Sequence, residues 1–372
     1  SVHVGVSVIF ATAPASNNGI VGGWATFNGV NWVVPGANGA AATALSSYTP
    51  MAASGLSTTA NYLSTADLGV TGAESINSLK LAGAQTLTLG GVLTVSTGGV
   101  LFDNSTGAAT ITGGTLGASA SEVIIHTAGS NAANALSVAS LISGGAGSLT
   151  KSGNGTLIIT GANAFTGSVN INAGTLQLSG SSAAIGSAQT GTTLLNLRQG
   201  ATLDLNAAGA LGSISPGVPN APRIAVGALV GSGSIVNTNA SPAVLTLVNG
   251  SANGTFTGSI NQTAGAITIV KNGGGTQSIV GAHNYTGATV IRGGTLAVTS
   301  LANIGQASGL GAGDATSDAT NAASLIFDGG RLLYTGSGNI SYDNRVQNIF
   351  QTTQTPSVSI NRLFTLTAAG GA

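Results

Sequence analysis

The feature that most constrains this chain is an internal repeat. Residues 151–179 align without a gap on residues 271–299, and 13 of the 29 aligned positions are identical. A partial copy lies between them at residues 254–260. Repetition at this scale is typical of architectures in which each unit buries its apolar face only against its neighbours. The chain is therefore expected to stack similar units into an elongated array.

Short runs within and around these units alternate apolar and polar residues. Val169-Asn-Ile171, Leu176-Gln-Leu178 and Ile267-Thr-Ile269 each place two branched apolar residues on one face. This period of two predicts half-buried β-strands. Glycine-containing turns separate many of the strands, and apolar residues at helical spacing are nowhere sustained, so the sequence predicts very little helix.

Many short strands could form a sandwich, a barrel or a solenoid, and the repetition favours the solenoid. Strands of a sandwich occupy distinct environments, whereas stacked coils meet nearly identical neighbours and converge in sequence. Coils of roughly 20–25 residues, stacked ~4.8 Å apart, would give a rod on the order of 70 Å long. Leu, Ile and Val are expected inside, and Thr, Ser, Asn and Gln outside.

The alignment also defines structural positions that the two full copies share. They are turn glycines, an aromatic residue before a Thr-Gly pair, and a core leucine. An aromatic residue at a regular interval could form a stripe for stacking sugar rings, but packing at a corner of the coil is the favoured interpretation. These positions are Gly153, Gly155, Phe165, Gly167, Gly174 and Leu176 in the first copy, and Gly273, Gly275, Tyr285, Gly287, Gly294 and Leu296 in the second.

The signature Gly-Asn-Gly-Thr-Leu, Gly-Ala-Asn-Ala-Phe-Thr-Gly and Ile-Asn-Ala-Gly-Thr-Leu-Gln-Leu spans residues 153–178 and recurs in 273–298. It resembles the autotransporter-associated β-strand repeat, or passenger-associated transport repeat, of bacterial surface passenger domains. The resemblance implies an all-β, right-handed parallel β-helix (β-solenoid) with loop excursions, located extracellularly or at the outer cell surface. It also implies a secretion signal and a translocating domain, which are expected in segments outside these residues.

Two regions are predicted along the chain. Residues 1–74 lack the repeat and are expected to be a variable or capping region with long loops, whereas residues 75–372 form the repetitive solenoid. Trp24, Phe27 and Trp32 cluster in the first region. They could contact a glycan, but bulky apolar groups are also needed to cover an end or a side of the rod, and this second interpretation is favoured.

Composition excludes several kinds of chemistry. The 372 residues include 9 basic and 9 acidic side chains and no Cys, so the formal net charge is zero. Such a chain lacks the cationic surface of a nucleic-acid binder, and no apolar run reaches the ~18 residues of a transmembrane helix. We predict no catalytic residue, no cofactor and no metal site. His283, aligned with Asn163, is expected to face solvent at a turn, and Asp314 and Asp318 are expected in a solvated turn rather than a Ca²⁺ site.

Two functions remain open at the level of sequence. The favoured one is a non-catalytic extracellular structural or adhesive rod, which could associate with itself along its axis or contact surface glycans or neighbouring cells. The alternative is a polysaccharide-binding or polysaccharide-degrading β-helix protein, whose groove would lie beside the expected loops at 213–222 or 309–318. Clustering of at least two carboxylates within ~5–10 Å in such a groove would favour this alternative.

Overall fold

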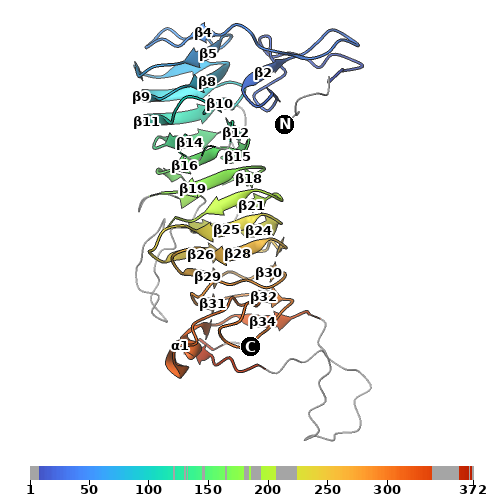
Figure 1. The fold of residues 1–372 in the computed structure, drawn as a ribbon, viewed down its shortest axis with the longest axis vertical. Coiled ribbons are helices and arrows are strands. Elements are labelled where there is room, and N and C mark those ends of the chain that lie inside the picture. Colours follow the sequence, from blue (N-terminus) through green and yellow to red (C-terminus); the bar gives the residue numbers. More distant parts are fainter. Residues whose placement is uncertain are drawn as a thin grey trace, which may run out of the picture.

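A computed structural model of the chain shows a long stack of strands with the N-terminal residues at one end (Figure 1). Nearly all sheet pairing along the stack is parallel, and the strands of successive coils lie directly over one another. The predicted β-solenoid class is therefore confirmed. The structure describes residues 8–119, 122–129, 131, 133–144, 147–163, 166–179, 184–185, 194–206, 224–336, 360–367 and 369–370.

The largest sheet runs the length of the rod and contains thirteen strands. Each coil contributes one strand, which pairs in parallel with its counterparts in the coils above and below. In spatial order from the N-terminal end, its strands are β4 (Thr49–Pro50), β5 (Asn61–Ser64), β8 (Ser78–Ala82), β10 (Gly99–Asp103), β12 (Glu122–Thr127), β15 (Ser148–Ser152), β18 (Val169–Ile171), β21 (Leu194–Leu197), β24 (Ala228–Gly231), β27 (Gly254–Phe256), β30 (Thr276–Ile279), β32 (Thr295–Val298) and β34 (Arg331–Tyr334).

The other faces of the rod are formed by an eleven-stranded, a six-stranded and a two-stranded sheet. The eleven-stranded sheet consists of β6 (Leu68–Val70), β7 (Glu74–Ile76), β9 (Gln85–Val95), β11 (Ala109–Ala118), β13 (Leu136–Val138), β14 (Leu141–Gly144), β16 (Thr156–Ile159), β19 (Thr175–Leu178), β22 (Thr202–Asp204), β25 (Ser234–Asn237) and β28 (Ser259–Gln262). The six-stranded sheet consists of β23 (Ile224–Val226), β26 (Ala243–Leu247), β29 (Ile267–Lys271), β31 (Thr289–Ile291), β33 (Leu325–Phe327) and β35 (Thr365–Leu366), and the small sheet of β17 (Ala162–Asn163) and β20 (Ala184–Ile185).

The core consists of aliphatic columns that run along the rod. One column joins Leu136, Leu157, Leu176, Leu203 and Ile235 through consecutive in-register pairs, and all five side chains are fully buried. Alternation within each strand explains this pattern, because every second side chain points inward. The expectation that Asn and Gln lie outside is met only in part, because the side chains of Asn77, Asn237 and Gln277 are also buried.

The two full repeat copies lie on different faces of the rod. In the first copy, Lys151 of β15 pairs with Ile171 of β18 in the thirteen-stranded sheet. In the second copy, Lys271 of β29 pairs with Ile291 of β31 in the six-stranded sheet. Equivalent residues of the copies therefore do not line up along one face, although their local geometry is the same.

The N-terminal residues add a separate element beside the rod. β1 (Thr26–Phe27), β2 (Asn31–Val34) and β3 (Thr43–Ala44) form a small antiparallel sheet, which lies next to the first coils in Figure 1. Parallel pairing of the solenoid already begins at β4, earlier than the boundary expected at residues 74 and 75. Among the described residues, the helix content is a single six-residue helix, α1 (Asp318–Ala323).

Candidate functional sites on the solenoid

The repeat copies share a buried lysine whose ammonium group is held by backbone carbonyls. Lys151 is fully buried, and its Nζ donates to the carbonyl oxygens of Ser152 at 2.9 Å, Gly153 at 2.7 Å and Ala173 at 3.0 Å. The first two carbonyls belong to the turn of its own coil, and the third belongs to the next coil. The lysine therefore connects two successive turns.

Lys271 repeats this arrangement in the second copy. Its Nζ donates to the carbonyl oxygens of Asn272 at 2.8 Å, Gly273 at 2.9 Å and Gly293 at 3.1 Å. Burial lowers the pKa of Lys151 to about 7 and that of Lys271 to about 8, because a charged amine loses hydration inside the rod. We did not predict this role from the sequence, although the alignment of two lysines in a chain with nine basic residues was a signal.

The shared glycines lie in turns between strands, and their backbone geometry is repeated in both copies. Gly174 has a φ of 65° and Gly294 a φ of 60°. A Cβ on Gly174 would lie 2.4 Å from the carbonyl oxygen of Gly155, and one on Gly294 would lie 2.3 Å from that of Gly275. These turns of successive coils therefore touch through their backbones, which leaves no room for a side chain.

The aromatic repeat positions that the structure describes do not form a stripe on the surface of the rod. Tyr285 is fully buried, and its hydroxyl lies 2.9 Å from Thr289 Oγ1. Phe256 of the partial copy is also fully buried, and Phe165 lies outside the described residues. Leu176 and Leu296 are buried core residues in β19 and β32.

The prediction that His283 faces solvent is wrong. The side chain is 1% exposed, and its Nδ1 accepts a hydrogen bond from the backbone N–H of Ile260 at 3.2 Å. Its backbone pairs with Ser308 in an isolated antiparallel bridge. Burial lowers the pKa of the imidazole to about 4, so the residue is neutral at pH 7.

The three N-terminal aromatic residues have different environments. Trp24 is 63% exposed, Phe27 is partly buried, and Trp32 is fully buried. Trp32 packs with Ile20 and Leu101. Because Leu101 lies on β10 between the inward-facing Val100 and Phe102, this contact covers the outer face of the thirteen-stranded sheet. The glycan-contact hypothesis stays a prediction, and only Trp24 and Phe27 have exposed ring surface to support it.

Polar contacts hold the same N-terminal element on the rod. The Lys80 ammonium on β8 donates to Asn31 Oδ1 at 2.8 Å and lies 5.2 Å from the centre of the Tyr48 ring. His126 on β12 hydrogen-bonds the carbonyl oxygen of Gly23 at 3.1 Å, and its ring meets that of Trp32 edge-on at 5.8 Å. The element thus spans three successive strands of the sheet.

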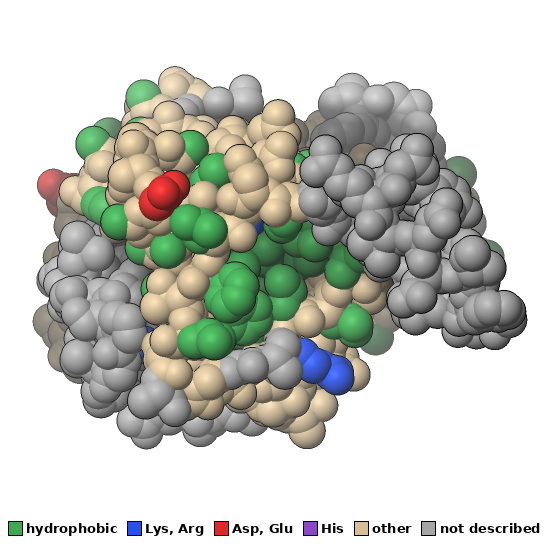
Figure 2. Space-filling view, turned by 90° about the horizontal axis from the view of Figure 1, so that it is seen from below, with side chains coloured by type: hydrophobic (Ala, Val, Ile, Leu, Met, Phe, Trp, Pro, Cys, Tyr) green, Lys and Arg blue, Asp and Glu red, His purple; other side chains and the backbone are tan. Residues whose placement is uncertain are grey.

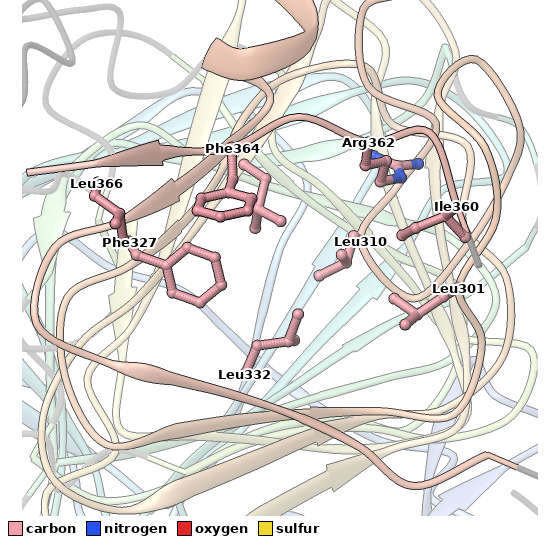
Figure 3. Close-up of a pocket in the computed structure, with 9 residues that line it drawn as sticks. Leu301, Leu310, Phe327, Leu332, Ile360, Arg362, Phe364 and Leu366 are labelled. Atoms are coloured by element: carbon pink, nitrogen blue, oxygen red, sulfur yellow. The ribbon is translucent and has the colours of Figure 1, made fainter. Parts of the chain in front are cut away.

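An apolar hollow lies at the C-terminal end of the rod. Figure 2 looks onto this end and shows a recess of hydrophobic side chains. Its cavity of about 460 Å³ is lined by the side chains drawn in Figure 3, among which Phe327 and Phe364 meet edge-to-face at 5.7 Å. Arg362 at its margin donates to backbone carbonyls including those of Ala302 and Ala312. The described residues therefore leave part of the core of the last coil open.

The acidic residues do not form a metal site in the part of the chain that the structure describes. That part contains no group of three or more His, Asp or Glu side chains arranged to hold a metal ion. Asp314 Oδ1 accepts a hydrogen bond from the backbone N–H of Thr316 at 2.9 Å, as in a local turn, and Asp318 begins α1. The proline-containing segment 213–222 lies outside the described residues. No described helix has the length and apolar character needed to span a membrane.

These observations define a class of protein, the repetitive parallel β-solenoid, in which corner motifs recur along the rod. Residues 149–178 and 269–298 match the passenger-associated transport repeat family. These windows contain both lysines and the turn glycines described above. The chain therefore carries this repeat, and the resemblance inferred from the sequence is confirmed.

A curated relative extends the comparison beyond the two repeat windows. Over 230 residues the chain is 36% identical to the adhesin BmaC autotransporter of Brucella suis biovar 1 (strain 1330). The aligned region covers 61% of this chain and 5% of the relative, so the chain corresponds to a small part of that protein. No match was found among solved structures.

Proposed function

We propose that this chain is part of an autotransporter passenger and acts as a non-catalytic structural or adhesive rod outside the bacterial cell or at its outer surface. The observation that carries the proposal is the passenger-associated transport repeat, found twice on a parallel β-solenoid. The similarity to a protein named as an autotransporter adhesin supports it independently.

The architecture is suited to a structural role, in which a stiff, elongated shape is sufficient for function. Backbone hydrogen bonds run continuously from coil to coil, and the core columns follow them along the axis. Such an array is stiff because each coil is held by both neighbours. A rod of this kind presents a long polar surface to a partner without requiring an active site.

Surface glycans or neighbouring cells are the partners that we propose for this surface, and nucleic acid is not, because the net charge is zero. The test combines binding of the purified chain to cell monolayers and a glycan array with a reducing-sugar assay on the polymers that bind. We expect binding without release of sugar. Release of reducing ends would overturn the non-catalytic proposal and favour the polysaccharide-degrading alternative.

Association of two copies along the rod axis is a further part of this proposal. Among the described residues, no strand pairs with the outer edges of β34 and β35, and the apolar hollow beside them is open, so this end offers strand and core surface to a second copy. Sedimentation velocity over a range of concentrations tests this idea. We expect elongated dimers to increase with concentration, whereas a monomer at every concentration would contradict it.

A further inference from the structure

The two repeat copies use different side chains for the same contact between coils. In the first copy, Asn163 Oδ1 accepts a hydrogen bond from the backbone N–H of Ile142 at 2.6 Å. In the second copy, His283 Nδ1 accepts from the backbone N–H of Ile260 at 3.2 Å. Both acceptors are buried, and both bind an amide one coil earlier in the chain. The contact is therefore equivalent, although the acceptor differs.

This difference matters because only one of the two acceptors, the imidazole of His283, can gain a proton when the solution is acidified toward pH 4. A carboxamide oxygen keeps its acceptor capacity at every physiological pH, whereas an imidazole nitrogen that gains a proton becomes a donor. Protonated His283 would then place an N–H against the N–H of Ile260 inside the rod. The second ring nitrogen, Nε2, is also buried and has no hydrogen-bond partner.

The described groups around His283 include no partner that would stabilise a positive charge on the imidazole. Tyr285 is the titratable residue on the same segment, and its hydroxyl is engaged with Thr289. On the neighbouring segments, the Arg362 guanidinium donates to Ser308 Oγ, and Ser308 is bridged to the backbone of His283. Among the described residues, no carboxylate is hydrogen-bonded to the imidazole. Burial of the imidazole away from water therefore opposes its protonation.

We propose that His283 makes the rod sensitive to acid at the second repeat, because protonation of its imidazole breaks a hydrogen bond between two coils. Asn163 makes the equivalent, pH-insensitive hydrogen bond in the first repeat. Acidification would then loosen the solenoid at the second repeat first. The first repeat would keep the same contact, so the response would be local rather than uniform along the rod.

The sign of the pH dependence follows from the folded and unfolded states. The pKa of His283 is lowered from 6.5 to about 4 in the folded chain, so the unfolded chain binds more protons between these values. Stability is therefore complete above pH 6.5 and falls as the pH decreases toward 4. The difference in pKa corresponds to a change on the order of 10²-fold in the local opening equilibrium.

Amide hydrogen exchange of Ile260 and Ile142, measured from pH 7 to pH 4 and corrected for the intrinsic rate, tests the proposal in the full chain. In the unmodified chain we expect the protection of Ile260 to fall on the order of 10²-fold while that of Ile142 is retained. In His283→Asn, which introduces the side chain already present in the first copy, we expect Ile260 to keep its protection.

The reciprocal variant, Asn163→His, is expected to transfer the acid sensitivity to Ile142. If this variant does not fold, His283→Asn alone still decides the matter, because it installs an acceptor that the fold already uses. His126, whose pKa is also about 4, is unchanged in every variant and serves as an internal background. An unchanged loss of protection at Ile260 in His283→Asn would overturn the proposal, as would full protection of Ile260 at pH 4 in the unmodified chain.

Discussion

At the scale of single residues, the buried lysines are the clearest test of how the repeat holds its turns. Replacing Lys151 by Met keeps the apolar stem but leaves the three carbonyl acceptors of Ser152, Gly153 and Ala173 without their donor. We expect a loss of about 1–3 kcal/mol in the free energy of unfolding, measured by urea denaturation. Arg198→Met removes an exposed cation two coils further along the chain and is the control. An equal effect of both substitutions would show that charge, and not the carbonyl contacts, decides the result.

The same lysine predicts a dependence of stability on alkaline pH. Its pKa is lowered from 10.5 to about 7 in the folded chain, so the unfolded chain binds more protons between these values. The free energy of unfolding is therefore expected to rise as the pH increases from 7 toward 10.5. Lys151→Met should reduce this rise in urea denaturation curves recorded at several pH values, and the rise that remains is the part expected from Lys271, whose pKa is lowered to about 8. A curve of unchanged slope in the variant would contradict the assignment.

At the scale of the strand and turn, the close approach of successive coils predicts an ordering of glycine substitutions. Gly174 and Gly200 both have positive φ, of 65° and 80°, but a Cβ on Gly200 would meet nothing within 4 Å. Gly200→Ala should therefore cost only the backbone strain of roughly 1–2 kcal/mol. Gly174→Ala adds a backbone clash with Gly155 and should cost clearly more. Thermal unfolding measures both variants, and equal costs would refute the close packing of these turns.

The elements of this rod could be predicted from the sequence because the alternation of apolar residues was strong and local. Val169, Ile171, Leu176 and Leu178 were expected to face inward, and all four are fully buried. Side chains at the corners obey a different requirement, since they must satisfy backbone groups of a neighbouring coil. Polarity alone therefore misplaced His283, whose imidazole accepts a hydrogen bond inside the rod.

At the scale of the whole molecule, the sequence did not reveal which face each repeat occupies. The segment between the copies sets their rotation about the axis, and this rotation depends on the path of the intervening coils rather than on the repeats themselves. Lys151 and Lys271 therefore lie in different sheets. The position of the N-terminal element could not be predicted either. Its aromatic residues indicated that it covers part of the rod, but not whether that part is an end or a side.

The N-terminal element, residues 8–45, covers the outer face of the thirteen-stranded sheet and is called the cover. Its contacts lead to a last prediction, about the order in which parts of the molecule unfold. Trp32 belongs to a small apolar cluster outside the solenoid core, with Ile20 and Leu101, whereas Trp24 is largely exposed. Trp32→Ala should weaken docking of the cover by about 3–5 kcal/mol but leave the coils stacked, because the aliphatic columns do not include this ring. Limited proteolysis should then cleave residues 8–45 rapidly while the remaining chain resists digestion. Trp24→Ala should digest like the unmodified chain. Cleavage throughout the rod in Trp32→Ala would instead mean that the cover and the solenoid unfold as one cooperative unit.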